Sequence, residues 1–130
     1  MANYCGSART NYFRVKDASA FRTWAKRFAL GVVERDGHFC LLPGERSDSG
    51  TFYLFDEDED DSLDVCDEIA AHLVEDSVAI VIESGAENLR YISGWAVAIN
   101  SRGERVEITL DAIYKLAEEK FGIIPTQAVY

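Results

Sequence analysis

Apolar and polar residues alternate near the start of the chain and then change to a helical period. The segment 12–16 alternates from Phe13 onward, as a half-buried strand does, and Asp17 follows it as a residue type that caps helices. Behind Asp17, apolar residues recur three and four positions apart, and basic residues occupy the other face. The apolar positions are Phe21, Trp24, Ala25 and Phe28. The pattern predicts a strand over 12–16 and an amphipathic helix that ends at Gly31.

Two short apolar runs predict a β-hairpin after this helix. They cover residues 32–35 and 38–42, and the dipeptide Asp36-Gly37 between them suits the left-handed conformations of a type I′ turn. After a loop over 43–50, the run 51–55 predicts a further short strand that leads into an acidic segment.

The acidic segment contains five apolar residues at helical spacing, which predict a second helix. These residues are Leu63, Cys66, Ile69, Ala70 and Leu73. The helix is expected to begin near Asp61 or Ser62. The continuous apolar run 77–83 then predicts a central strand, which is expected to turn at Gly85.

The last third of the chain predicts a second hairpin and a third helix. Residues 89–99 and 104–110 are expected to form the strands of this hairpin. A helix is expected to begin behind Asp111 and to end at Gly122, with four apolar residues facing the core. These four are Ile113, Leu116, Ala117 and Phe121.

The predicted elements follow the order β-α-β-β-β-α-β-β-β-α. Helices that accompany mostly antiparallel hairpins indicate an α+β fold, with about three helices on a mostly antiparallel sheet. A chain of 130 residues fits a single domain, so 1–130 is expected to fold as one unit. The N-terminal residues 1–9 and the C-terminal tail 123–130 carry no predicted element and are expected to be flexible.

The negative charge is concentrated in one segment of the chain. There are 23 acidic and 13 basic residues, for a net charge of −10, and eleven of the acids lie within 56–76. No lysine or arginine lies between Arg46 and Arg90. Without those eleven acids the rest of the chain holds 12 acids and 13 bases, and is nearly neutral. A net charge of this sign repels nucleic acid and anionic membranes, so we expect neither as a direct partner.

Nine of these acids form the predicted partner-binding site. If the second helix begins near residue 61, Asp60, Asp64 and Glu68 recur along one helical face and resemble a row of phosphates. Like charges at this spacing cost a few tenths of a kcal/mol per pair, which favours a role other than stability. The alternative is that acids at a helix N-terminus only favour the macrodipole and solubility. The nine residues are Asp56, Glu57, Asp58, Glu59, Asp60, Asp61, Asp64, Asp67 and Glu68.

The same segment partly matches a calcium loop. Asp56, Asp58 and Asp60 fall at the first, third and fifth loop positions. However, Asp61 stands where a sharp turn needs glycine, and Asp67 stands where the longer glutamate is usual. We therefore predict no specific metal site.

Groups for catalysis are few in this sequence. His38 and His72 are the only histidines, and the chain has no nucleophile motif and no glycine-rich phosphate loop. We expect no enzymatic activity and no cofactor. The three cysteines show no close spacing, which indicates reduced thiols. Reduced thiols, together with the lack of a long apolar run at the N-terminus or elsewhere, predict a cytoplasmic protein.

The large aromatic residues have two interpretations. Trp24 and Trp95 fit a core, Trp24 by its helical spacing and Trp95 by its strand. Tyr53, Tyr91 or Trp95 would alternatively present an aromatic anchor beside the acidic segment. The core is the favoured interpretation.

Two stretches resemble those of short, largely uncharacterised acidic proteins carried by phages and plasmids. They are Ala-Arg-Thr-Asn-Tyr-Phe-Arg-Val-Lys-Asp over 8–17 and Leu-Arg-Tyr-Ile-Ser-Gly-Trp-Ala-Val-Ala-Ile-Asn over 89–100. Small acidic proteins of mobile elements include anti-CRISPR and anti-restriction inhibitors, several of which present DNA-like negative surfaces to host nucleases. The resemblance thus implies, by analogy, an inhibitor in the host cytoplasm that blocks the basic nucleic-acid-binding surface of a defence complex.

One alternative is an intracellular immunity or antitoxin-type protein, which would neutralise a basic toxin through the same acidic residues. A homodimer is a further candidate assembly, because an exposed strand edge would pair two copies.

Overall fold

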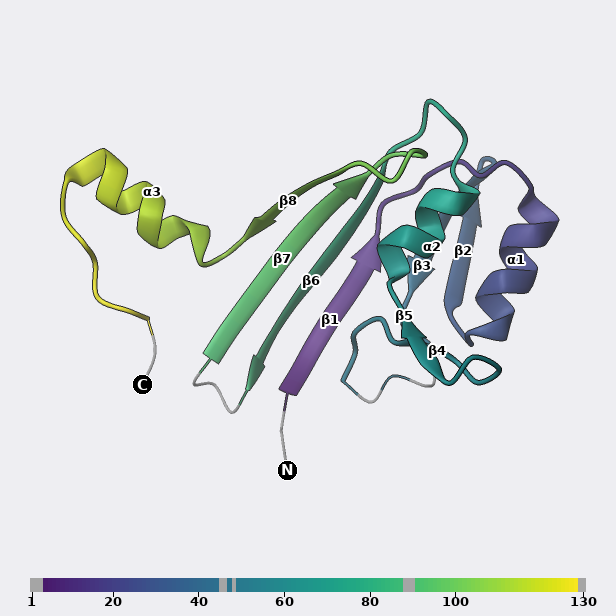
Figure 1. Ribbon diagram of the computed structural model, residues 1–130, viewed down its shortest axis with the longest axis horizontal. Coiled ribbons are helices and arrows are strands. Elements are labelled where there is room, and N and C mark those ends of the chain that lie inside the picture. The colour runs from purple at the N-terminus through teal and green to yellow at the C-terminus, as the bar shows by residue number, and fades with distance from the viewer. Residues whose placement is uncertain (1–3, 45–46, 48, 88–90, 129–130) are drawn as a thin grey trace.

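Four antiparallel strands form the main sheet, in the spatial order β1-β6-β7-β8 (Figure 1). They are β1 (Tyr4–Thr10), β6 (Ala79–Glu87), β7 (Tyr91–Ile99) and β8 (Arg105–Thr109). The computed structural model describes residues 4–44, 47, 49–87 and 91–128. Since β6 is an interior strand and begins with a continuous apolar run, the prediction of a central strand is confirmed.

Two small hairpins and three helices complete the described part of the chain. The hairpins pair β2 (Gly31–Arg35) with β3 (His38–Leu42), and β4 (Leu54–Asp56) with β5 (Asp61–Leu63). The helices are α1 (Ala18–Arg27), α2 (Val65–His72) and α3 (Ala112–Phe121). The α+β class is confirmed, and the element order agrees approximately with the prediction. None of these helices combines the length and apolar composition that crossing a membrane requires.

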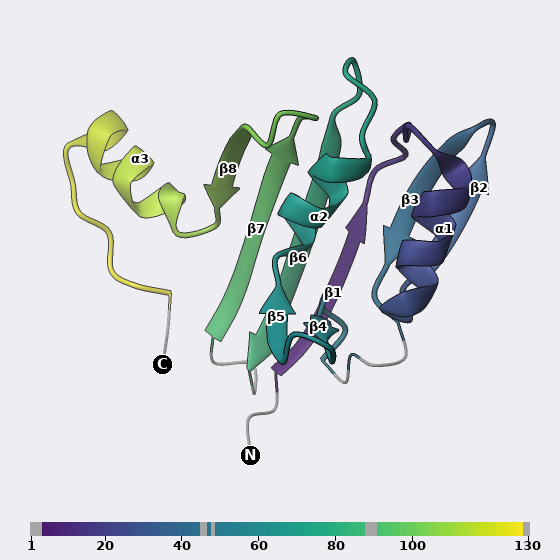
Figure 2. The same ribbon diagram turned by 45° about the vertical axis from the view of Figure 1, so that its right-hand side comes forward.

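The core lies beneath α2 and extends to α1 and the β2–β3 hairpin. Helix α2 contacts β6 and β7, so it covers one face of the main sheet (Figure 2). The Phe21 side chain of α1 is fully buried, and its ring centroid lies 5.7 Å from that of Phe13 and 5.2 Å from that of Phe39. Burying each such side chain contributes about 1.5 to 3 kcal/mol, which fixes the helices against the sheet.

The structure confirms the start of α1 and the first hairpin. The Asp17 carboxylate accepts a hydrogen bond from the backbone N–H of Ala20 at 3.1 Å, as expected of an N-cap. Asp36 and Gly37 have φ angles of 52° and 78°, which the turn between β2 and β3 requires. The prediction that Gly31 ends the helix is wrong, because Ala29 already takes the left-handed conformation with a φ of 55° and Gly31 opens β2.

The N-terminal part of the chain differs from the prediction. Residues 4–9, expected to be flexible, form β1 together with Thr10, and the strand pairs with β6 along its whole length. The segment 12–16, expected to be a strand, makes only two isolated bridges, between Phe13 and Phe39 and between Val15 and Leu73. The residues of β1 are small or polar and show no apolar alternation that would predict a strand. Backbone hydrogen bonds to β6 hold this edge strand in place.

Three expectations about the second half also need correction. Gly85 lies within β6, opposite Gly6 of β1, and makes no turn. Asp111 precedes α3, but its side chain forms no capping hydrogen bond. None of the residues of α3 is buried, so its apolar face does not point into the core. Figure 1 shows α3 beyond the β8 edge of the sheet, far from α1 and α2.

Other expected features agree with the structure or lie partly outside the described residues. The hairpin of β7 and β8 and the end of α3 at Gly122, which has a φ of 69°, are confirmed. Residues 123–128 of the expected tail form no helix or strand. Positions 1–3, 45–46, 48, 88–90 and 129–130 lie outside the described residues, including parts of the expected flexible ends, the 43–50 loop and the second hairpin.

Candidate acidic binding surface

The acidic residues 56–61 form a hairpin rather than a helix start. β4 ends at Asp56, β5 begins at Asp61, and these two residues pair across the hairpin. Asp60 has a φ of 51°, a left-handed conformation that aspartate tolerates in turns and that a helix excludes. The prediction that the second helix begins near residue 61 is therefore wrong. We call residues 54–63 the acidic hairpin, and the macrodipole explanation does not apply to it.

The turn of the acidic hairpin is organised by Asp56. The Oδ1 atom of Asp56 accepts hydrogen bonds from the backbone N–H of Asp58 at 3.0 Å and from the guanidinium of Arg27 at 2.8 Å. Only 12% of the Asp56 side chain is exposed, whereas 87% of the Asp58 side chain is exposed. Asp56 thus holds the turn in shape, and the acids that follow it point into solvent.

Helix α2 begins three to four residues later than expected, at Val65, with Asp64 as its N-cap. The Asp64 Oδ1 atom accepts the backbone N–H of Cys66 at 2.8 Å. The guanidinium of Arg105 on β8 donates to Asp67 at 2.6 Å and lies 3.2 Å from Asp64, so it bridges the helix to the sheet. Its hydrogen bond to Asp67 raises the pKa of Arg105 further above its ordinary value. Exposed ion pairs of this kind contribute about 0 to 1 kcal/mol each.

Glu68 also has a structural partner. Its Oε1 atom accepts the indole N–H of Trp24 at 3.1 Å. The Trp24 ring packs against the core and lies 5.1 Å from the His72 ring, measured between centroids. Partial burial lowers the pKa of His72, while the Glu68 carboxylate opposes that shift. His72 is thus a packing residue that is neutral at pH 7.

The nine predicted binding residues therefore separate into two groups. Asp56, Asp64 and Glu68 hold the hairpin, the helix N-terminus and an indole in place. The other six are exposed, five on the acidic hairpin and one on α2. They are Glu57, Asp58, Glu59, Asp60, Asp61 and Asp67. Two of these six also pair with an arginine, Asp67 with Arg105 at 2.6 Å and Asp58 with Arg27 at 3.4 Å. Sequence reasoning did not separate the groups, because the partners Arg27, Trp24 and Arg105 are distant along the chain.

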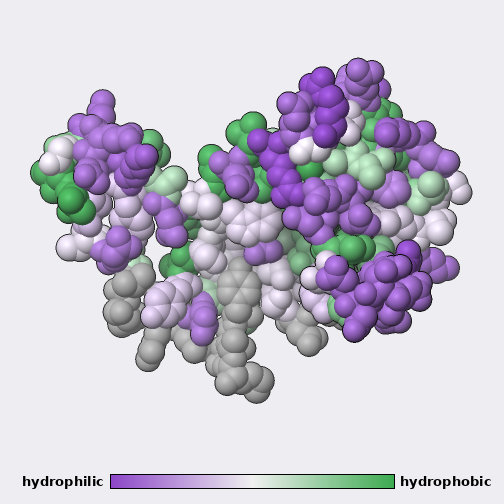
Figure 3. Space-filling view, viewed as in Figure 1, coloured by the Kyte–Doolittle hydropathy of each residue, from purple (hydrophilic) through white to green (hydrophobic). Residues whose placement is uncertain are grey.

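The balance of charge in this region is strongly negative. The described ion pairs bring three arginines, Arg14, Arg27 and Arg105, against the eleven carboxylates of 56–76, so negative charge exceeds positive charge by eight within this set. Arg27 and Arg105 each pair with two carboxylates, so each set of one arginine and two carboxylates remains negatively charged. Figure 3 shows the acidic hairpin as a dense hydrophilic projection at the lower right of the molecule.

An exposed aromatic residue stands next to this projection. Tyr53, just before β4, is 51% exposed, and its ring stacks on that of Phe55 with 6.3 Å between centroids. Of the other two candidate anchors, Tyr91 lies at the start of β7 and is 53% exposed, and Trp95 packs against the core and donates its indole N–H to Glu83 at 3.0 Å. Tyr53 is thus the aromatic residue that accompanies the acidic hairpin.

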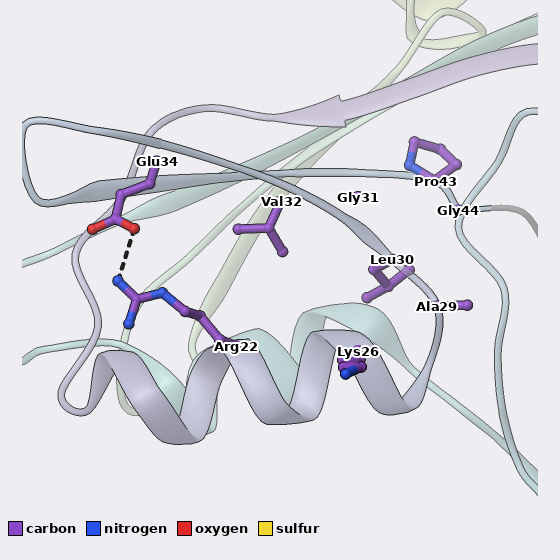
Figure 4. A pocket seen from close by; sticks show the side chains of 9 residues that line it. All are labelled: Arg22, Lys26, Ala29, Leu30, Gly31, Val32, Glu34, Pro43 and Gly44. Carbon is purple, nitrogen blue, oxygen red and sulfur yellow. Dashed lines mark hydrogen bonds and ion pairs between the residues drawn. The ribbon is translucent and has the colours of Figure 1, made fainter.

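A hollow with a volume of about 930 Å³ lies elsewhere, between α1 and the β2–β3 hairpin (Figure 4). Arg22 and Glu34 point toward one another at its edge and form an ion pair of 2.7 Å. The remaining lining is mostly aliphatic side chains and backbone, with Lys26 as the other charged group. No nucleophile, histidine or carboxylate pair lines it, so it presents no catalytic set among the described residues.

Groups that bind metals are not gathered in the described residues: no three histidine, cysteine or acidic side chains are placed to hold an ion. Asp56, the first residue of the partial calcium pattern, is committed to Arg27 and to its own turn. Burial, and next to it the charge of Asp64, raises the pKa of the Cys66 thiol to about 11, so this cysteine is an unreactive core residue.

Comparisons of the chain with protein-family models, with curated proteins and with solved structures found no match in any of the three.

Proposed function

We propose that the protein is a non-enzymatic inhibitor of a host defence nuclease complex, of the anti-CRISPR or anti-restriction type. It blocks a basic nucleic-acid-binding surface with the acidic hairpin and the adjacent turn of α2. The observation that carries this proposal is the hairpin itself, a short rigid projection whose outward acids lie in one turn fixed by Asp56 and Arg27.

Rigidity matters because a flexible acidic tail loses conformational entropy when it binds. The turn between β4 and β5 is closed by three backbone pairs and by the side-chain bonds of Asp56. The carboxylates therefore meet a partner already positioned, which lowers the cost of ordering them. A surface that binds DNA phosphates presents arginine and lysine side chains, which are the groups that pair with such carboxylates.

The two groups of acids have different roles in this proposal. Asp58, Glu59, Asp60, Asp61 and Asp67, together with Glu57, contact the basic partner. Asp56, Asp64 and Glu68 act indirectly, since they maintain the shape that presents the first group. Tyr53 supplies apolar area beside the charges, as an aromatic anchor does in many interfaces.

The test compares two double variants with the same change in net charge. Asp58→Lys with Glu59→Lys alters the acidic hairpin, and Glu118→Lys with Glu119→Lys alters two adjacent exposed acids on the polar face of α3. Each is added to purified CRISPR effector complexes and restriction enzymes with labelled target DNA, and DNA binding is measured by gel shift. Wild type and the α3 variant are expected to prevent DNA binding, and the hairpin variant is expected to lose at least about tenfold in inhibition.

Equal inhibition by both double variants would contradict the role of the acidic hairpin. Protection of cells from a basic toxin, with no effect on any defence complex, would replace the proposal with the immunity alternative. Raising the salt concentration from about 0.05 M to 0.2 M should weaken inhibition by wild type, because screening acts on exposed charges.

A further inference from the structure

The main sheet has a second face that is apolar and uncovered over β6, β7 and β8, while Arg9 and Ser7 of β1 make its β1 edge polar. Side chains alternate between the two faces of a strand, and directly paired residues share a face. Val81, Val97 and Ile99 are buried beneath α2, so the residues between them and their cross-strand neighbours point the other way. The outward set on β6 and β7 and from β8 to Leu110 is Ile80, Ile82, Ser84, Ala86, Ile92, Gly94, Ala96, Ala98, Val106, Ile108 and Leu110.

None of these residues is charged, and only Ser84 is polar. An antiparallel sheet with one face in solvent usually carries polar residues at these positions. The composition is instead that of a sheet covered on both faces. Yet Ile92, Val106 and Ile108 are 70%, 74% and 67% exposed. A face of this size and composition is typical of an interface.

A small hollow marks the middle of this face. It has a volume of about 210 Å³ and lies between the outward side chains of β6, β7 and the end of β8. Gly94 makes room for Leu110, because a Cβ atom at Gly94 would lie 2.9 Å from the Leu110 Cδ1 atom. The hollow is large enough to receive one large apolar side chain.

Helix α3 is the other uncovered apolar element. Ile113, Leu116 and Phe121 share one face and are 60%, 56% and 69% exposed. Lys115, Glu118 and Glu119 occupy the other side of the helix, and Lys120 in the last turn is the one charged residue on the apolar side. Ile123 and Ile124 behind the helix are 69% and 75% exposed. An isolated helix of ten residues is marginal in water, so α3 requires a surface to pack on.

The connection to β8 directs α3 away from the sheet of its own chain. The Leu110 N–H donates to the Gly94 carbonyl at 3.0 Å, which continues the strand ladder up to the helix. The Ile113 N–H then donates to the Leu110 carbonyl at 3.1 Å, so the chain turns within two residues. Figures 1 and 2 both show α3 projecting past the β8 edge rather than over either face. Figure 3 shows its lobe standing apart from the sheet.

We infer that two copies of the chain form a dimer in which α3 of each copy packs on the uncovered sheet face of the other. Both complementary surfaces belong to one chain, and a two-fold axis buries both through one reciprocal contact. A partner of another kind would have to supply a helix and a receiving face together.

The exposed area is sufficient for such a dimer. Ten large apolar residues on the sheet face, α3 and the residues behind it are each more than half exposed. If each of these side chains has about 100 Å² of apolar surface when fully exposed, the ten together expose on the order of 600 Å² per copy. A stable interface buries about 800 Å² per partner, of which about 65% is apolar in homodimers.

The test uses two variants that damage different halves of the contact. Ile108→Glu places a charge on the sheet face, and Leu116→Glu places one on α3. Val33→Glu is the matched control, because Val33 is an exposed residue of β2, on a different sheet. Molar mass is measured by light scattering during gel filtration, with circular dichroism to verify the fold.

Wild type and Val33→Glu are expected to be dimeric at tens of micromolar, and the other two variants to dimerise at least about tenfold more weakly. A mixture of Ile108→Glu with Leu116→Glu is expected to recover a heterodimer, since one copy retains an intact helix and the other an intact sheet face. Native mass spectrometry identifies it.

Three results would overturn the inference: a wild type that stays monomeric, a Leu116→Glu variant that dimerises as well as wild type, or a mixture without heterodimer. The second would indicate pairing through the β8 edge or between sheet faces, which does not use α3.

Discussion

The two ends of the molecule differ in whether their side chains find partners within the same chain. At the end formed by α1, α2 and the acidic hairpin, groups that need partners find them: Asp56 has Arg27, and the Trp24 indole has Glu68. At the end formed by β8 and α3, apolar side chains such as Ile108 and Leu116 remain exposed. The first end therefore presents charge on a surface that is complete within the chain, whereas the second end exposes apolar surface that we infer a second copy covers.

The largest difference is expected in core truncations. Phe21→Ala removes a fully buried ring at the completed end and should lower the free energy of unfolding by about 3 to 5 kcal/mol. Ile108→Ala, at the exposed end, should change it by less than about 0.5 kcal/mol. Urea denaturation at a concentration where the protein is monomeric measures both. A large loss from Ile108→Ala under these conditions would mean that the sheet face is covered within the monomer.

A smaller effect is expected when Glu68, which accepts the hydrogen bond of the Trp24 indole, is substituted. Glu68→Ala leaves the partly buried Trp24 N–H without its acceptor and should cost about 1 kcal/mol of stability. Glu68→Gln retains a carbonyl acceptor and should be nearly neutral. Glu59→Ala, in the exposed turn, should leave urea unfolding unchanged. If Glu59→Ala destabilised as much as Glu68→Ala, the separation of the acids into two groups would be wrong.

The pH dependence of stability should reveal His72. Partial burial lowers the pKa of His72 in the folded protein, with Lys16 acting in the same direction and Glu68 and Asp17 opposing it. The unfolded chain then binds a proton first as pH falls below about 6.5, so stability is full above that pH and decreases below it. Melting temperatures at pH 7.0 and 5.5 measure the loss, and His72→Phe should reduce it. An unchanged loss in that variant would assign it to other groups.

The smallest expected signal comes from the thiols. Cys5 is exposed, whereas Cys40 and Cys66 are buried, and the pKa of Cys66 is raised to about 11. At pH 8 a thiol reagent should modify Cys5 rapidly and the other two only after unfolding. Three equally fast modifications in the native protein would show that the completed end opens readily.

The elements that the sequence predicted well are those with local signals. Asp17 and the spacing of Phe21 and Ala25 define α1, and Asp36-Gly37 defines the first hairpin, because caps and turns depend on neighbouring residues. The apolar run of β6 defines a central strand for the same reason.

The elements that escaped prediction depend on distant contacts. β1 is held by backbone pairing with β6, more than 70 residues away, which leaves no periodic pattern in its side chains. The acidic hairpin has no glycine in its turn, since Asp60 takes the left-handed position. The apolar face of α3 could be predicted from its helical period, but the surface that it faces could not. The period shows which side of a helix is apolar and does not show which molecule packs against that side.

The most direct test of this contrast is hydrogen exchange measured on one sample at a low and at a high protein concentration. We expect the amides of α3 and β8 to become at least about tenfold more protected at the high concentration, while those of the acidic hairpin keep the same rates. Equal exchange in α3 at both concentrations, or a change of similar size at both ends, would contradict the account.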